Sequence, residues 1–316
     1  MSRTCVALLF LGLASPAVAA AQTATPASRT LVSGDSTVRH TVPGHVPVGL
    51  AAGLANWPPD MYCDGTASAS VQPLDPRELL DRVQLASKCG MRLVLIIPRK
   101  LLTTTHRVSG PFSLDSAERA IDRYANQLPP DTLQKYRANL IGVNLADDYT
   151  CLRCWGGQEI TQAQLTEWAN YTRTKLPGLP LGIRRTPDWV AAYPPLAASI
   201  DYVWAQYHAG RGNAQTYFDR AAETASKLGL RVVMGVNVKD CNGPGSKPCS
   251  AEELTSAGTV AVNHPANCAF LSWRYEDTIW EKPEIRQAWE GLFALAKARP
   301  VQECRRAGSG TPAPSF

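Results

Sequence analysis

Residues 140–149 read LIGVNLADDY, an apolar run of strand length that ends in two adjacent carboxylates, Asp147 and Asp148. Such a run is typical of a strand that is buried on both faces of a parallel sheet. In these sheets, catalytic and binding groups gather beyond the carboxyl ends of the strands. The two acids therefore indicate a candidate site, although two acids after a strand can also do no more than cap the next turn.

Side chains alternate between the two faces of a strand, and this parity separates the two acids. Gly142, Asn144 and Asp148 share one face, whereas Ile141 and Asp147 share the other. We expect the face with small and polar residues to line the interior of a barrel and the bulky face to contact the surrounding helices. The pattern therefore predicts that Asp148 is the inward-facing acid.

The remaining sequence alternates between strand and helix patterns. Apolar runs predict further strands at 46–54, 91–98, 179–185, 201–208, 230–238 and 268–277. Apolar residues at helical spacing predict helices at 75–90, 113–128, 131–139, 161–178, 187–198, 213–228, 251–258 and 284–298. Asp75 and Thr161 are the expected starts of two of these helices, and Gly90 is the expected end of the first.

This order gives seven strands, where a closed (β/α)8 barrel of the TIM type has eight. We therefore predict a single (β/α)8 barrel over residues 46–304, with one strand irregular, missing, or hidden in 31–42 or 100–113. The residues after the first strand are interpreted as a long loop. A doubly wound sheet is the alternative fold, but the chain has no GxGxxG after its first strand and no phosphate-binding loop.

Both ends of the chain are predicted to lie outside the barrel. Residues 1–21 have the positive start, short apolar centre and AVAA cleavage region of a secretory signal peptide. Residues 22–45 are rich in Thr, Ser, Pro and Gly and predict a flexible lead-in, and 305–316 predict a disordered tail. We expect a secreted or periplasmic protein that has no membrane attachment after cleavage, because the apolar run is too short to span a bilayer.

Cleavage would remove Cys5 and leave eight cysteines, an even number that predicts disulfides in an exported protein. The predicted pairs are Cys241–Cys249 and Cys268–Cys304. Cys151 and Cys154 are a further candidate pair, and Cys63 and Cys89 would then be left to each other. A zinc site is the alternative interpretation of the CLRC motif at 151–154, but the chain lacks a second CxxC or a spaced pair of histidines to complete it.

Composition argues against several classes of partner. The net charge is a modest +5, and no basic stripe with interleaved aromatic residues is present, so nucleic acid is not expected as a partner. The five histidines are scattered, which argues against a metal-dependent hydrolase. We expect no metal, no cofactor and a monomer.

Polar residues recur near the carboxyl ends of the predicted strands, on the parity assigned to the barrel interior. Random surface polarity would not often fall on one parity at the same end of so many strands. Arg184 could still only pair with neighbouring carboxylates, and His208 could be a satisfied core histidine. The residues of this set are Arg184, Gln206, His208, Asn237, Arg274 and Glu276.

Aromatic residues accompany these strand ends. In loops at the predicted site, where exposed aromatic faces often stack on sugar rings, the chain carries Trp57, Tyr62, Tyr149 and Trp155. Trp204, Trp273 and Tyr275 are assigned to the bulky parity and are expected to pack the barrel against its helices. A bulge at the strand end could still turn Trp273 toward the site.

The closing pattern AFLSWRYED at 269–277, followed by WEKPEIRQAWEGLFALAKAR at 280–299, resembles exported bacterial proteins of the (β/α)8 glycoside hydrolase superfamily. The resemblance covers most of residues 45–300 and rests on strand order and two short motifs. Those relatives carry a DEP-like motif where this chain has Asp147, Asp148 and Tyr149. The chain departs from the common retaining pattern, because its middle strand ends in Asp148 where an Asn-Glu pair is expected.

Glycosidic cleavage needs two carboxyl groups across a cleft, one to protonate the leaving oxygen and one to attack the sugar or activate water. The sequence assigns the first role to Asp148 and the second to Glu276, with an oligo- or polysaccharide as substrate. Asp147 and Asp277 would hold or tune these acids. The substrate-binding or tuning residues are Arg184, Gln206, His208, Asn237, Arg274, Trp57, Tyr149 and Trp273. A secreted carbohydrate-binding barrel without catalysis is the alternative function.

Overall fold

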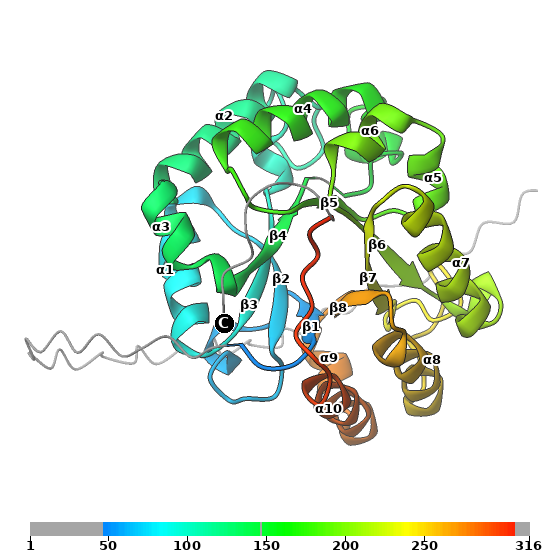
Figure 1. Ribbon diagram of the computed structural model, residues 1–316. Coiled ribbons are helices and arrows are strands. Elements are labelled where there is room, and N and C mark those ends of the chain that lie inside the picture. The colour runs from blue at the N-terminus through cyan, green and yellow to red at the C-terminus, as the bar shows by residue number, and fades with distance from the viewer. Residues whose placement is uncertain (1–46, 146, 307–316) are drawn as a thin grey trace, which may run out of the picture. The chain divides into compact units, whose positions relative to one another are not determined.

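A computed structural model describes residues 47–145 and 147–306; the predicted signal peptide and lead-in, and the tail beyond residue 306, lie outside them. Eight parallel strands close into a barrel in sequence order, with β8 pairing back to β1 (Figure 1). This confirms the predicted (β/α)8 fold. The strands are β1 (Ala51–Ala55), β2 (Ala69–Pro73), β3 (Arg92–Ile96), β4 (Leu140–Asn144), β5 (Leu181–Ile183), β6 (Tyr202–Tyr207), β7 (Arg231–Val236) and β8 (Asn267–Ser272).

The α-helices lie outside the strands in Figure 1. The longer ones begin where the sequence predicts: the side chains of Asp75 and Thr161 accept backbone N–H bonds at the starts of α1 and α4. The helices are α1 (Pro76–Lys88), α2 (Leu114–Gln127), α3 (Pro130–Lys135), α4 (Gln162–Lys175), α5 (Pro187–Ala191), α6 (Pro194–Ser199), α7 (Ala214–Lys227), α8 (Ala251–Asn263), α9 (Asp277–Trp280) and α10 (Pro283–Lys297).

The eighth strand is β2, in the segment that the sequence analysis assigned to a long loop. It is not in 100–113, and 31–42 lies outside the described residues. Its polar side chains are buried and bonded to the neighbouring backbone: the Ser70 hydroxyl donates to the Leu54 carbonyl, and the Gln72 amide donates to the Trp57 carbonyl. A polar strand of this kind lacks the apolar pattern by which strands are recognised.

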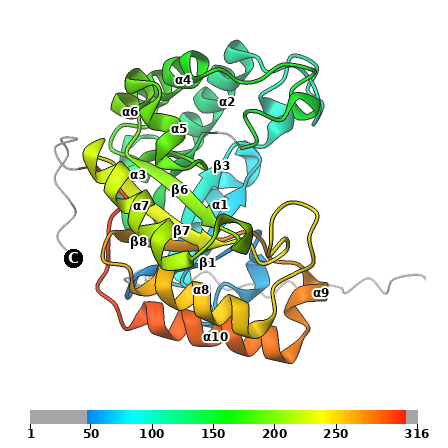
Figure 2. The same cartoon turned by 90° about the vertical axis from the view of Figure 1, so that its right-hand side faces the viewer.

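A continuous apolar layer lies between the strands and the helices. Alternate residues of the strands, such as Leu93, Val143 and Met234, pack there against the helices. Figure 2 shows α8 and α10 beside each other on the outer side of the barrel, where the side chain of Leu292 packs against Gly258. Within the described residues, no helix has the length and hydrophobicity needed to cross a membrane.

The inside of the barrel is filled by side chains. Tyr202 and Trp204 of β6 lie there with small aliphatic residues of the other strands. Glycines make room for this filling: a Cβ at Gly182 would lie 2.2 Å from the Tyr202 ring, and one at Gly235 would lie 1.7 Å from the carbonyl oxygen of Leu271. The small residues of β5 and β7 thus face inward as predicted, and large rings occupy the space that they leave.

The predicted parity of β8 is wrong. Leu271 and Trp273 contact the interior cluster, whereas Phe270 packs against Trp289 of α10. The pairing of β7 with β8 shifts by one residue near the start of the strands, which turns the odd-numbered residues of β8 inward. The expectation that Trp273 packs against the helices is therefore also wrong. It is wrong for Trp204 as well, because this ring lies in the interior cluster, on the same parity of β6 as Gln206.

A similar shift affects the start of β4. The pairing of β3 with β4 is irregular after Leu93, and Ile141 joins the interior cluster instead of facing the helices. Further along the strand the prediction is confirmed, because Val143 and Leu145 face the helices and a Cβ at Gly142 would meet the ring of Tyr202 at 2.9 Å.

The two predicted disulfides, Cys241–Cys249 and Cys268–Cys304, are formed. The candidate pairs Cys63–Cys89 and Cys151–Cys154 are formed as well, so Cys151 and Cys154 are not free to bind zinc. Cys268–Cys304 joins β8 to the segment after α10, which crosses the amino ends of the strands (the red trace in Figure 1). Two residues assigned to the disordered tail continue this segment: Arg305 donates to the Gly178 carbonyl, and Arg306 donates to the Ala197 carbonyl.

We predict that replacing Cys268 and Cys304 by serine lowers the free energy of unfolding by about 2–4 kcal/mol, because this bond closes a loop of 36 residues. Chemical denaturation of the native protein and the double variant measures the difference. Mass mapping of the non-reduced native protein is the companion check. Free thiols at both positions, or equal stability of the two proteins, would contradict the predicted role of this bond.

Candidate functional site

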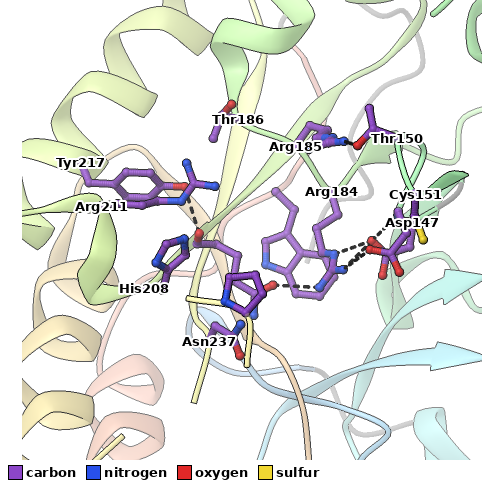
Figure 3. Close-up of a pocket in the computed structure, with 14 residues that line it drawn as sticks. Asp147, Thr150, Cys151, Arg184, Arg185, Thr186, His208, Arg211, Tyr217 and Asn237 are labelled. Atoms are coloured by element: carbon purple, nitrogen blue, oxygen red, sulfur yellow. Dashed lines mark hydrogen bonds and ion pairs between the residues drawn. The ribbon is translucent and has the colours of Figure 1, made fainter. Parts of the chain in front are cut away.

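The site lies at the carboxyl ends of the strands, where two cavities open at the mouth of the barrel. The first has a volume of about 320 Å³ and is lined from the ends of β4 to β7, by residues that include Asp147, Arg184, Gln206 and Asn237 (Figure 3). The second has a volume of about 370 Å³ and is lined mainly by apolar residues after β1, β2 and β3. Asp147 lines both cavities, so this residue lies between them.

Asp147 is held by Arg184. Its Oδ1 atom accepts from Nε of Arg184 at 2.7 Å and lies 2.5 Å from Nη2. The Asp147 side chain is 16% exposed. Burial raises the pKa of the Asp147 carboxyl above its ordinary value, and the positive charge of Arg184 opposes part of this rise.

Asp148 lines the first cavity beside Asp147 and is more open to solvent, with a side chain that is 46% exposed. Its carboxylate pairs with Arg99 at 3.1 Å and lies 3.5 Å from Arg184. The backbone of Asp148 is left-handed, with a φ of 54°, and its carbonyl accepts from the N–H of Cys151 and the indole of Trp155. Asp tolerates this conformation better than most residues do.

The parity argument therefore does not separate the two acids. Strand β4 ends at Asn144, and Asp147 and Asp148 lie beyond this end, where Asp148 has a left-handed backbone. Alternation of side chains holds only within an extended strand. As a result both aspartates line the first cavity, and the acid expected to face away, Asp147, is the less exposed of the two.

Arg184 occupies the centre of this arrangement. Its guanidinium lies over the rings of Trp273, at 4.5 Å from the centroid, and Trp204, at 5.7 Å. It also donates to the side-chain oxygen of Gln206 at 3.0 Å, and its backbone N–H donates to the Tyr149 hydroxyl at 3.1 Å. Arg184 thus does pair with a carboxylate, and it also connects the ends of β4, β5, β6 and β8.

The polar residues predicted on β6 and β7 are brought together. Gln206, His208 and Asn237 all line the first cavity, and Figure 3 labels the last two. The Asn237 side chain accepts from the backbone N–H of Asp240, which fixes the loop after β7. Desolvation by burial lowers the pKa of His208, and the nearby charge of Arg211 lowers it further, so the imidazole is neutral near pH 7.

Glu276 follows β8 and immediately precedes α9. Its Oε1 atom accepts from Nζ of Lys239 at 2.9 Å and lies 2.9 Å from Nη2 of Arg274. The hydrogen bond from Lys239, followed by that from Arg274, lowers the pKa of the Glu276 carboxyl. Glu276 does not line either of the two cavities, whereas Arg274 and Trp273 line the second. Its neighbour Asp277 accepts from the hydroxyl of Tyr275 at 2.8 Å.

The expectation of exposed aromatic faces in the loops is wrong. The four rings concerned are buried: Trp57, Tyr62, Tyr149 and Trp155. Trp57 packs edge-on against Tyr275 and Trp280, and Tyr149 stacks on Trp189 at 5.7 Å. Of the four, Trp155 reaches a cavity, as part of the lining of the second. Trp57, Tyr62 and Tyr149 instead pack in the hydrophobic core.

Several residues of the site were missed by the sequence analysis. Arg99 and Lys239 pair with Asp148 and Glu276, and Arg185, Arg211 and Tyr217 line the first cavity. Arg185 and Arg211 carried a usable signal, because each lies within a few residues of the carboxyl end of a predicted strand. Arg99 and Lys239 carried the same signal, because each directly follows a predicted strand, whereas Tyr217 gave none because it lies in a helix.

No protein-family model matches the chain, and no curated protein matches it by sequence. Similar solved structures include a glucosidase from Croceicoccus marinus, with a TM-score of 0.53 and 10% identity. This similarity covers 80% of this chain and 66% of the glucosidase, so the chain spans just under two thirds of the length of that enzyme. The endoglucanase Cel5A of Pseudomonas stutzeri has a TM-score of 0.53 and 11% identity over 81% of this chain and 99% of the enzyme. SrfJ of Salmonella typhimurium has a TM-score of 0.51 and 12% identity over 81% and 76%. These similarities show a shared fold.

We predict that Glu276→Gln destabilises the fold at pH 7 by at most about 1 kcal/mol, because the ion pairs it removes are partly exposed. The pKa of the Glu276 carboxyl is lower in the folded state than in the unfolded state. The stabilisation by these ion pairs is therefore complete at pH values above the unfolded-state pKa of about 4.3, and it is lost as the pH falls through the folded-state pKa. Urea denaturation of both proteins at pH 7 and pH 3 measures the effect. A difference that grows at pH 3 would contradict the assigned ion pairs.

Proposed function

We propose that the chain is a glycoside hydrolase that cleaves a glycosidic bond held where the two cavities meet. One observation carries the proposal: Asp147 lines both cavities, so sugar units in the two cavities would place the bond between them at this carboxyl group. The names of the similar structures, a glucosidase and an endoglucanase, support the same class of reaction for this fold.

Asp147 is the better proton donor of the two aspartates. A general acid must keep its proton near neutral pH, and burial shifts the pKa of Asp147 in that direction. Arg184 fixes the carboxyl group through its Nε and Nη2 atoms, which holds the acid in one orientation toward the leaving oxygen. Asp148, to which the strand pattern assigned this role, then tunes Asp147 by its negative charge and remains the second candidate.

Glu276 is the proposed nucleophile or base. That role needs an ionised carboxylate, and Lys239 and Arg274 keep the Glu276 carboxyl in this form. Two acids whose environments shift their pKa values in opposite directions are the arrangement that glycosidic cleavage requires. Gln206, His208 and Asn237 would donate to and accept from sugar hydroxyls in the first cavity.

We further propose that the protein works in a secreted or periplasmic compartment. Its four disulfides fit an oxidising environment. N-terminal sequencing of the exported protein should find a start near Gln22, as expected from the signal peptide pattern. Recovery of exported protein that still begins at Met1 would contradict cleavage.

A carbohydrate-binding barrel without catalysis is the second candidate function. The specific observation in its favour is that each proposed acid is engaged in an ion pair: Asp147 with Arg184, Asp148 with Arg99, and Glu276 with Lys239. In addition, Glu276 does not line the cavities that the aspartates line. Catalysis would require the substrate to rearrange these pairs, whereas binding would not.

Three variants test the assignment: Asp147→Asn, Asp148→Asn and Glu276→Gln. Each keeps size and most hydrogen bonds while it removes the ionisable group. We expect the first and third to lower turnover by about 10²–10⁴, the range for loss of general acid or base catalysis. Asp148→Asn should cost much less. The measurement is release of reducing ends from a panel of neutral and acidic polysaccharides, and Asp131→Asn on the exposed side of α3 is the matched control.

The outcomes separate the alternatives. Wild-type turnover in Asp147→Asn together with loss in Asp148→Asn would move the acid by one residue, to the position expected from the sequence. Wild-type turnover in Glu276→Gln would remove Glu276 from the mechanism. Binding of a polysaccharide by the native protein without any cleavage would establish the non-catalytic function instead.

A further inference from the structure

Arg185 and Arg211 both contribute to the wall of the first cavity. In the part of the chain that the structure describes, neither of them forms an ion pair with a carboxylate. Arg185 donates to the hydroxyl of Thr150, a neutral group. A guanidinium has five N–H donors, so most of the donors of both residues remain available to a bound molecule.

Aromatic rings hold both guanidinium groups in place. Arg185 lies over the rings of Tyr149 and Trp189, at 5.7 and 5.5 Å from their centroids. Arg211 lies 5.5 Å from the centroid of the Tyr217 ring, and Figure 3 shows the two side chains together. The Tyr217 hydroxyl is itself fixed by donating to the backbone of β6. Stacking on a ring orients the planar group and leaves its edge free for hydrogen bonding.

The other charged groups of the cavity add no net negative charge. Asp147 pairs with Arg184 and Asp148 pairs with Arg99, so each carboxyl group has a cation beside it. His208 adds no charge near pH 7, because its Nδ1 atom is buried without a hydrogen-bond partner in the described structure and a protonated ring would bury an unsatisfied N–H there. Arg185 and Arg211 therefore give this cavity an excess of positive charge.

We propose that the wall formed by Arg185 and Arg211 is a subsite for an anionic group of the glycan, either the carboxylate of a uronic acid or a sulfate ester. The planar fork of arginine matches the oxygen pairs of both groups. This inference rests on the proposed function for the glycan as ligand, and it adds that the substrate is an acidic polysaccharide. Its negative charge would be bound in the first cavity, beside the proposed cleavage point at Asp147.

Isothermal titration calorimetry with the full chain tests the subsite. The probes are an oligogalacturonide, its methyl ester, which has no charge, and a sulfated oligosaccharide with a neutral backbone. We use the Glu276→Gln variant so that no probe is cleaved during the titration, because Glu276 does not line the first cavity and its replacement leaves the pair of Asp147 with Arg184 intact. At least one of the two acidic probes should bind about tenfold or more tightly than the methyl ester, with an affinity that falls as salt is added.

Arg185→Gln and Arg211→Gln should each reduce this preference for charge about tenfold. Arg123→Gln, which removes one positive charge from the exposed face of α2, is the matched control and should leave the preference unchanged. A preference for the oligogalacturonide identifies the carboxylate as the anionic group, and a preference for the sulfated probe identifies the ester.

Equal affinity for the charged and methylated probes, no binding of any probe, or a preference that survives both arginine variants would overturn the proposed subsite. These results are independent of catalysis. Cleavage of a neutral polysaccharide with no preference for charge would leave the proposed hydrolase and remove the subsite. Selective binding of an acidic probe that the native protein never cleaves would leave the subsite and remove the proposed hydrolase.

Discussion

The ion pair between Asp147 and Arg184 is the interaction on which the site depends. It joins the end of β4 to the end of β5, and the guanidinium continues the connection by lying over Trp273 from β8 and Trp204 from β6. If Arg184 were absent, a poorly exposed carboxylate would lose its counter-charge, which is costly, and the strand ends would lose their common partner. The pair therefore both holds the proposed acid and organises the mouth of the barrel.

The packing of side chains inside the barrel explains why the pair of Asp147 and Arg184 lies at the mouth. Tyr202 and Trp204 fill the interior, in space left by glycines such as Gly182 and Gly235. A filled barrel has no central channel, so polar groups at the strand ends rest on an apolar floor and open toward solvent on one side. This floor lowers the hydration of Asp147 and so raises its pKa, while Glu276, on the rim and beside two cations, is shifted in the other direction.

Much of the fold could be predicted from the sequence, because its signals are local. Apolar runs and helix caps gave seven of the eight strands and the main helices, and an even number of cysteines in an exported protein indicated the disulfides. The eighth strand, β2, was missed because Ser70 and Gln72 are polar but satisfy their hydrogen bonds within the barrel. No local pattern reveals partners that are distant in sequence.

The site was predicted less completely, for the same reason. Its members were found from their positions at strand ends, but parity failed where register shifts turn β8 and where the chain leaves β4 before Asp147 and Asp148. Burial of rings such as Trp57 and Tyr149 depends on loops that come together only in the fold. The ion pairs of Arg99 with Asp148 and of Lys239 with Glu276 join residues 49 and 37 positions apart in the chain, so local spacing could not indicate them.

The central claim is that two carboxyl groups at the barrel mouth differ in protonation, and a titration measures this most directly. Carboxyl ¹³C shifts of the native protein, followed with pH and assigned with Asp147→Asn and Glu276→Gln, report both groups. The account predicts that Asp147 titrates above the usual value of about 3.9 and Glu276 below the usual value of about 4.3. Titration of both groups at their usual values, or a shift of both in the same direction, would contradict it.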